Sequence, residues 1–159
     1  MDGGSLYSVP MLIHELSATE CVTILERTDL GRLACAHHDQ PYIVPIHFSF
    51  DRARHCLYAF STVGQKIEWM RENPKVCVEV EDVADRTQWT TVLAFGRYED
   101  MGDSPEDEAA RHTASALFEQ RPDWWLPAAA KVVSREERGS VLIYRIQIDR
   151  LTGRRAGRR

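Results

Sequence analysis

Hydrophobic and polar residues alternate along six segments of the chain, and this alternation predicts six β-strands. The clearest segment is 42–50, in which Tyr42, Val44, Ile46, Phe48 and Phe50 fall on one face. The other five are 32–37, 55–60, 75–83, 89–98 and 141–149, and a turn at 51–54 joins the second and third segments into a hairpin. Gly96 marks a position at which the fifth strand is expected to carry a bulge.

Helical spacing and capping residues predict three helices. Ser17 and Glu20 have the spacing of a capping box, so a helix is expected from about residue 19 to 29, with Gly31 as its stop. A second helix is expected at 65–73, where Pro74 prevents continuation. Ser104 followed by Pro105 has the chemistry of a third helix start, and this helix should reach about residue 120.

These elements predict one mainly β domain, because six strands with helices only between the later ones do not alternate strictly as βαβ units. An antiparallel barrel with peripheral helices fits the pattern, and a sandwich stays open as the alternative. The chain has 159 residues, which suits one domain. We divide it into a flexible leader at 1–10, the domain at 11–150 and a basic tail at 151–159, interpreted as a disordered, solvated terminus.

Composition and charge disfavour several classes of function. The formal net charge of −4 disfavours a general nucleic-acid binder, although six acids gather in 99–108 and five arginines in 150–159. Because no apolar run is long enough to cross a bilayer and no signal peptide is recognisable, a cytoplasmic protein is expected. The four cysteines form no CxxC pair, which favours reduced core thiols over a disulfide framework or a zinc site.

Two positions in the strand region suggest a ligand site. Pro45 interrupts an apolar strand and cannot donate to a ladder, so the sheet should be open or bulged there; the same residue would also suit a protected edge strand. His47 lies two residues further on the same face, where a histidine is either a hydrogen-bonded structural residue or a catalytic one.

The segment from Ser61 to Lys66 predicts a phosphate site. A strand ends there, hydroxyl groups and Gly64 form a turn, and a lysine opens a helix. Unpaired amides at a helix start attract anions, and a lysine adds a full positive charge. An ordinary capped helix start would have the same pattern, and the Walker motif is absent.

Aromatic residues offer flat surfaces for a planar ligand, but most such side chains fill cores or interfaces. They are Trp69, Trp89, Trp124, Trp125, Tyr42 and Tyr58. No carboxylate pair, nucleophile elbow or HExxH helix is present in the sequence. If the protein is an enzyme, a cofactor is therefore expected to carry the chemistry.

Three segments, taken in order, carry a family resemblance: GRLACAHHDQPYIVPIHFSF, LYAFSTVGQKIEWMRENPKVCVEVEDV and WTTVLAFGRYEDM. Together they resemble the FMN-binding split β-barrels related to pyridoxamine 5′-phosphate oxidase, most closely the nitroimidazole-reductase-like branch. The resemblance implies a six-stranded antiparallel split barrel and a homodimer with FMN between protomers. It also implies where the cofactor binds: the ring along Val44, Pro45, Ile46 and His47; the ribityl phosphate at Phe60, Ser61, Thr62, Gly64, Gln65 and Lys66; the partner's strand at Trp89, Thr90 and Thr91; and a cover from Trp125.

The chain departs from true pyridoxamine phosphate oxidases, because Arg150 and Leu151 are followed by Thr152 and Gly153 rather than by the family's C-terminal arginine-leucine-x-proline signature. Vitamin B6 oxidation is therefore not expected. The leading hypothesis is an FMN-dependent oxidoreductase that passes electrons from a reduced nicotinamide to a small acceptor, such as a nitroaromatic or quinone, with His47 as the weak catalytic candidate. The alternatives are a non-catalytic module that binds or senses flavin, haem or deazaflavin, and a metal protein using Cys35, His37, His38 and His47.

Overall fold

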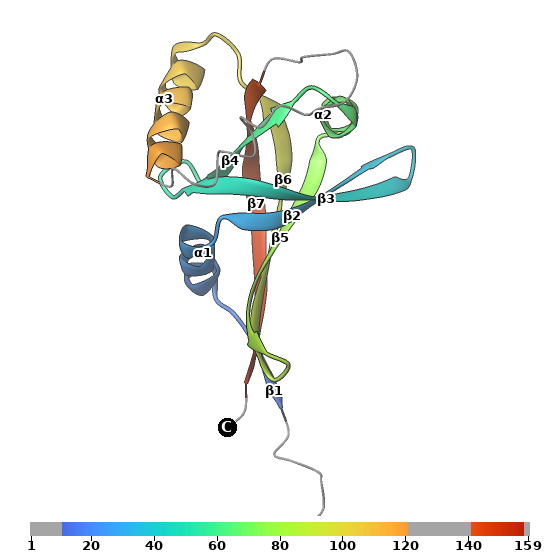
Figure 1. The fold of residues 1–159 in the computed structure, drawn as a ribbon, viewed down its shortest axis with the longest axis vertical. Helices are drawn as coiled ribbons and strands as arrows, with labels where there is room; N and C mark the ends of the chain where they lie inside the picture. The colour runs from blue at the N-terminus through green and yellow to red at the C-terminus, as the bar shows by residue number, and fades with distance from the viewer. Residues whose placement is uncertain (1–10, 121–140, 158–159) are drawn as a thin grey trace, which may run out of the picture.

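The chain folds into a closed ring of six antiparallel strands with three peripheral helices (Figure 1). The computed structural model describes residues 11–120 and 141–157. In chain order the elements are β1 (Leu12–Glu15), α1 (Ala18–Arg27), β2 (Leu30–His37), β3 (Gln40–Asp51), β4 (Cys56–Thr62), α2 (Gln65–Glu72), β5 (Lys75–Asp85), β6 (Gln88–Asp100), α3 (Pro105–Glu119) and β7 (Val141–Gly157). The ring runs β7–β4–β3–β2–β5–β6 and closes where β6 pairs again with β7. The barrel prediction is therefore confirmed, and the sandwich is excluded.

The apolar faces of the strands build the interior of the barrel. In β3, Ile46 and Phe48 are buried, as the alternation of this segment predicted, and they join a core that includes Leu33, Val78 and Ile146. A second cluster lies beneath α3 and includes Tyr58 and Phe118. All four cysteines are free thiols, three of them buried. In the described part of the chain, no helix has the length and apolar character required to span a bilayer.

The ring is closed, but β3 and β4 separate over part of their length and leave an opening there. These strands pair only where Phe48–Asp51 meets Cys56–Ala59, after which the last residues of β4 pair with β7 alone. Pro45 lies on the part of β3 that pairs only with β2, and its pairing with Arg32 continues without a register shift. Of the two expectations at Pro45, an open sheet is therefore correct and a bulge is not.

An arm extends below the ring (Figure 1). We use this name for β1, residues 81–91 of the β5–β6 hairpin and residues 151–157 of β7, which pair with one another. The interpretation of the arginine-rich segment as a disordered terminus is therefore wrong as far as residue 157. Its backbone bonds to β1 and β6, and Arg155 lies 3.6 Å from Glu20, so pairing partners distant in sequence order this polar segment.

Two glycines serve close approaches of backbone. Helix α1 ends at Arg27 with Thr28 as its C-cap, so Gly31 is not its stop. Gly31 instead lies buried in β2, where a Cβ would come within 3.0 Å of the Glu79 carbonyl oxygen. The register of β6 and β7 shifts at Gly96, but the extra residue is Asp149 on β7, so the bulge lies opposite the strand expected to carry it. A Cβ on Gly96 would lie 2.3 Å from the Gln147 carbonyl oxygen.

Candidate functional site

Helix α2 begins without a side-chain cap, directly after β4 and beside the opening of the barrel. Its N-cap residue is Gly64, whose extended backbone leaves open space around the position of a Cβ. The first amides of any α-helix lack intrahelical acceptors, and no side chain accepts a hydrogen bond from those of α2 at the N-cap. This helix start therefore presents donors and the positive end of a helix dipole.

Lys66 adds a full positive charge to the first turn of α2. Its side chain is half-buried, and no ion pair forms with it among the residues that the structure describes. Burial lowers the pKa of Lys66 below its ordinary value, and the nearby Cys35 thiol offsets this only in part. A half-buried cation without a partner is unfavourable, so an anion bound here would stabilise the protein.

Ser61 and Thr62 bring hydroxyl groups to the same turn. Both lie at the end of β4, and the Ser61 hydroxyl donates to the Thr62 carbonyl oxygen at 2.8 Å. We call residues 61–66 the cradle, because these six consecutive residues combine hydroxyls, a lysine and helix-start amides without a side-chain cap. The sequence predicted this combination, and the fold places it at the edge of the opening in the barrel.

The β3 part of the predicted site lies on the opposite edge of that opening, and its residues alternate between two faces. Ile46 is buried and Val44 packs against the core, whereas Pro45 is exposed and His47 is half-buried on the outer side. The Nδ1 atom of His47 is buried. The opening therefore has apolar residues on its inner side and lacks one backbone donor at Pro45.

The other predicted residues that the structure describes have different surroundings. Phe60 packs against Phe118 of α3, with ring centroids 3.9 Å apart, so it belongs to the second hydrophobic cluster. Trp89, Thr90 and Thr91 lie in the arm, where they pair with residues 154–156 of β7. Trp125, like Trp124, falls outside the described residues. A single chain therefore does not bring the strand at 89–91 to the cradle.

A groove of about 740 Å³ lies along the arm. Trp89 and Thr91 contribute to its wall, together with Glu15, Leu16, Glu79, Leu93, Leu151, Thr152, Gly153 and Arg154. Burial, with the charge of Glu81, raises the pKa of Glu79 despite the opposing charge of Arg32. The groove is thus a partly apolar channel with a carboxyl group that is easier to protonate than usual.

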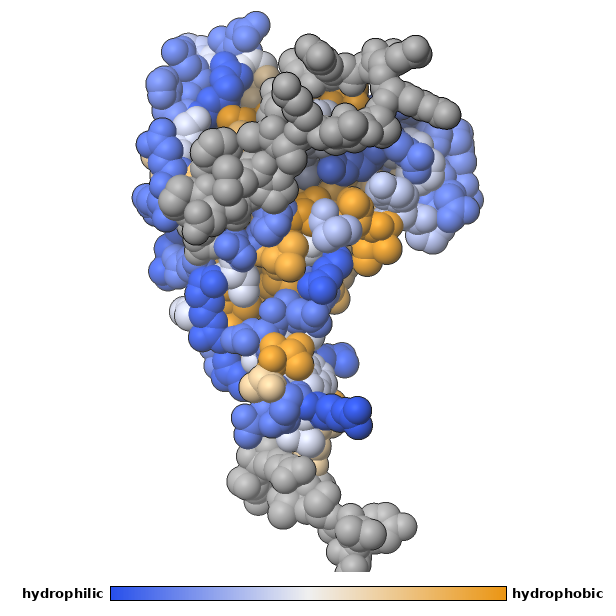
Figure 2. Space-filling view, in the orientation of Figure 1, coloured by the Kyte–Doolittle hydropathy of each residue, from blue (hydrophilic) through white to orange (hydrophobic). Residues whose placement is uncertain are grey.

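Pro45 and this groove belong to one continuous face of the sheet. Strand pairing aligns Pro45, Arg32, Glu79 and Leu93 in a row across β3, β2, β5 and β6. The adjacent row on the same side is mostly apolar and comprises Ile43, Ala34, Cys77 and Phe95. We call these two rows the outer face. Ile43 is 66% exposed, and Figure 2 shows hydrophobic surface gathered beside the base of the β2–β3 hairpin.

The aromatic residues and the histidines are arranged differently from the sequence-based expectation. Trp69 packs against Tyr42 and His37, whereas Trp89 lies in the arm and Tyr58 beneath α3, so they form no single aromatic surface. Of the four residues in the metal hypothesis, His37 and His38 lie together, while Cys35 is buried in the core. Their third neighbour is Glu72, which sequence spacing did not indicate because it belongs to a different element.

Comparisons with known proteins identify the relatives of this chain. The sequence profile of the family described as pyridoxamine 5′-phosphate oxidase matches residues 17–155. An uncharacterized protein of Rhizobium meliloti is 39% identical over 148 residues, which cover 92% of this chain and 97% of that protein. A crystal structure from Mesorhizobium loti, described as an FAD-binding protein, is 36% identical with a TM-score of 0.76 and covers 93% of this chain and 99% of the other.

A more distant structure shares the fold alone. A Bacteroides thetaiotaomicron protein, provisionally described as a 5-nitroimidazole antibiotic resistance protein, is 18% identical with a TM-score of 0.64. The alignment covers 94% of this chain and 90% of that one. A likeness over this much of the chain agrees with the ring of strands described above.

Proposed function

The chain belongs to the pyridoxamine 5′-phosphate oxidase family. On this premise we propose that it is a flavoprotein that holds a flavin nucleotide by its phosphate in the cradle. One observation carries the proposal: the half-buried ammonium of Lys66, which lacks an anionic partner in the described part of the chain, lies in the first turn of an uncapped helix. A phosphate ester would satisfy the amides, the dipole and the lysine together.

The cradle suits the part of the ligand that FMN and FAD have in common. Both carry a phosphate on the ribityl chain, and residues 61–66 provide for one phosphate group. The sequence resemblance favours FMN, while the Mesorhizobium loti relative is described as FAD-binding. Heat release of the bound nucleotide, followed by chromatography against FMN and FAD standards, decides between them.

The chain's own residues have separate roles in this proposal. The Ser61 and Thr62 hydroxyls and the α2 amides donate to phosphate oxygens, and Lys66 neutralises their charge. Val44 and Ile46 give the ring an apolar border, and His47 is placed to donate a hydrogen bond beside Pro45. A bound flavin supplies reversible electron transfer, so the protein needs no acid–base pair of its own.

We further propose that two copies join through the outer face. Its apolar row leaves Ile43 66% exposed, and exposed apolar surface of this kind marks interaction sites. A second copy would also bring its strand at 89–91 toward the cradle, which one chain does not do. Light scattering should give a dimer, and Ile43→Glu should shift it to a monomer with weaker flavin binding, whereas the arm variant Ile13→Glu should stay dimeric.

The binding test uses Lys66→Ala. We expect flavin affinity to fall by about 1 to 3 kcal/mol, the scale of a charge-assisted hydrogen bond. Titration of the flavin-free protein with FMN, followed by fluorescence, measures this loss. Unchanged affinity would remove Lys66 from the site and would overturn the cradle assignment.

The proposed activity is electron transfer from a reduced nicotinamide to a small acceptor. Stopped-flow mixing of the flavin-loaded protein with NADPH or NADH should bleach the flavin absorbance, and a nitroaromatic or quinone should restore it. Flavin that binds but is not bleached by either donor would contradict the oxidoreductase proposal. That result would favour a protein that stores or senses the cofactor.

A further inference from the structure

Three potential metal ligands meet at the end of α2 opposite to the cradle. His37 is the last residue of β2, His38 follows it in the turn to β3, and Glu72 is the last residue of α2. One ligand atom from each lies within 4.8 Å of the others. Zinc–ligand bonds of about 2.1 Å place tetrahedral ligands roughly 3.4 Å apart, so small rotations complete the set. The side chains of His38 and Glu72 are exposed to solvent.

The surrounding residues hold this cluster in place before any ion binds. The His37 ring stacks on Trp69, with centroids 5.3 Å apart and planes 26° apart, and its Nε2 contacts the Glu72 carboxylate. The Asn73 side chain donates to the Ala36 carbonyl oxygen at 2.9 Å and ties the end of α2 to β2. His38 has a positive φ of 46°, which fixes it in the tight turn. Preorganised ligands bind an ion at a smaller cost in conformational entropy.

Electrostatics at this helix end favour a cation. Glu72 places a carboxylate at the C-terminus of α2, where the helix dipole is negative and an acidic side chain is disfavoured. The neighbouring Arg71 is occupied, because its guanidinium forms two hydrogen bonds to Asp100, at 2.9 and 3.0 Å. A dication would therefore meet a negative helix terminus and a carboxylate that Arg71 does not neutralise.

We propose that His37, His38 and Glu72 form a binding site for a divalent transition metal, with zinc as its occupant. Two imidazoles and one carboxylate are typical ligands of zinc, whereas magnesium and calcium require mainly oxygen ligands. Three protein ligands leave a position for water. The ion links the last turn of α2 to the β2–β3 turn and so restrains the helix whose first turn belongs to the cradle.

The site is independent of flavin. Helix α2 has eight residues and is therefore roughly 12 Å long, so a group at one end can be removed without touching the other end. Zinc binding is expected in flavin-free and flavin-loaded protein alike. The experiment therefore separates this proposal from the proposed function.

Untagged full-length protein, treated with a chelator and dialysed, should bind one zinc per chain in competition with a chromophoric chelator. The melting temperature should rise with zinc, because a ligand that binds the folded state stabilises it. His38→Asn and Glu72→Gln should each weaken zinc binding by about ten-fold or more. Asparagine suits position 38 because it tolerates a positive φ. Cobalt in place of zinc should give visible absorption bands that both variants lose.

His112→Asn is the matched control, since His112 is an exposed histidine on α3 outside the cluster. It should bind zinc as the wild type does. Absence of zinc binding, or equal affinity in the wild type and both cluster variants, would overturn the proposal and leave only a hydrogen bond between His37 and Glu72. Glu72 is 65% exposed, so Glu72→Gln should fold and keeps the test decisive.

Discussion

Helices α2 and α3 begin in opposite ways on the same barrel. At the start of α3, the Ser104 hydroxyl accepts from the Asp107 amide at 3.1 Å, and Pro105 occupies the first turn. The Asp107 carboxylate in turn accepts from the Gly102 amide at 2.8 Å. At the start of α2 the N-cap is Gly64, with no side-chain hydrogen bond. The start of α3 is capped by side chains of the helix itself, whereas the described residues give the start of α2 no side-chain cap.

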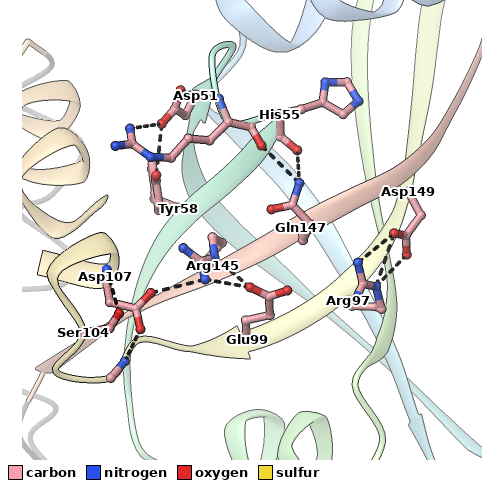
Figure 3. Close-up of polar contacts among 12 residues, drawn as sticks. Asp51, His55, Tyr58, Arg97, Glu99, Ser104, Asp107, Arg145, Gln147 and Asp149 are labelled. Atoms are coloured by element: carbon pink, nitrogen blue, oxygen red, sulfur yellow. Dashed lines mark hydrogen bonds and ion pairs between the residues drawn. The ribbon is translucent and has the colours of Figure 1, made fainter. Parts of the chain in front are cut away.

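The cations beside the two helix starts, Arg145 at α3 and Lys66 at α2, also differ in whether an acidic side chain pairs with them among the described residues. Arg145 lies 2.7 Å from Glu99 and 3.3 Å from Asp107 (Figure 3). Burial alone would lower the pKa of Arg145, but the hydrogen bond to Glu99 and the charges of both acids outweigh it and raise the pKa. For Lys66 burial is the larger effect, and its pKa is lowered.

Under the proposed function, this difference separates a structural helix start from a ligand-binding one. Helix α1 agrees with α3, because Ser17 and Glu20 form a complete capping box. Two of the three described helices thus supply their own acceptors. The third supplies donors and a cation that has no anionic partner among the described residues, as a phosphate site requires.

The variant with the largest expected effect gives α2 an N-cap side chain, as α3 has. In Gly64→Asp, the new carboxylate would enter open space, accept from the first amides of α2 and lie beside Lys66. We expect flavin affinity to fall at least about 100-fold, or about 2.7 kcal/mol, because the site now contains its own anion. Fluorescence titration measures the affinity, and urea unfolding of the flavin-free protein should show a gain of about 0.5 kcal/mol.

Gly64→Ala is the control for that variant. The extended backbone of Gly64 accepts any side chain, and no atom lies within 4 Å of the new Cβ. Its affinity should stay within about three-fold of the wild type, since a methyl group adds no charge. Equal losses in both variants would mean that steric exclusion, not competition for the amides, controls the site.

The next largest effect concerns Arg145, the paired cation of β7 that lies beside the start of α3. Arg145→Met should destabilise the protein by about 2 kcal/mol, because Glu99 and Asp107 lose their partner at a site where the arginine side chain is only 18% exposed. Flavin affinity should not change. Arg97→Met removes an ion pair with Asp149 whose arginine is 51% exposed, and it should cost clearly less, because solvent screens an exposed pair. Chemical unfolding compares the two, and equal costs would contradict the distinction.

Substitutions at the N-cap residues of the two helices should have a smaller effect on the free energy of unfolding. Ser104→Ala removes the hydroxyl that accepts from the Asp107 amide, and we expect a loss of about 1 kcal/mol in the free energy of unfolding. Gly64→Ala at the other helix should change it by no more than about 0.5 kcal/mol, because there is no cap to lose. A loss at position 64 as large as that at 104 would show that α2 is capped after all.

The sequence predicted the parts of this picture that depend on neighbouring residues. The ring strands were recognisable from their alternation, and the start of α2 from turn and helix-start residues that follow one another in the chain, whereas phosphate binding there stays a prediction. Strand β1 was missed because three of its four residues are exposed, so it has no apolar period. It exists through pairing with the end of β7.

Long-range pairing also explains the other features that the sequence did not predict. The strand character of 151–157 depends on β1 and β6 rather than on its own arginine-rich composition. The outer face requires the registers of β3, β2, β5 and β6 together, which no local pattern contains. Glu72 was missed for the same reason, since its neighbour His37 is 35 residues away in the sequence.

The smallest predicted effect is a pH dependence that belongs to Lys66 alone. Because the pKa of Lys66 is lower in the folded than in the unfolded protein, the unfolded state binds more protons between the two values. The stability of flavin-free wild type should therefore rise relative to Lys66→Met as the pH increases toward the ordinary lysine pKa of about 10.4. Urea unfolding of both proteins at several pH values measures the difference, and other titrating groups cancel. Bound phosphate should abolish this rise, because an anion restores the pKa of Lys66; a rise that persists with saturating flavin would place Lys66 away from the ligand.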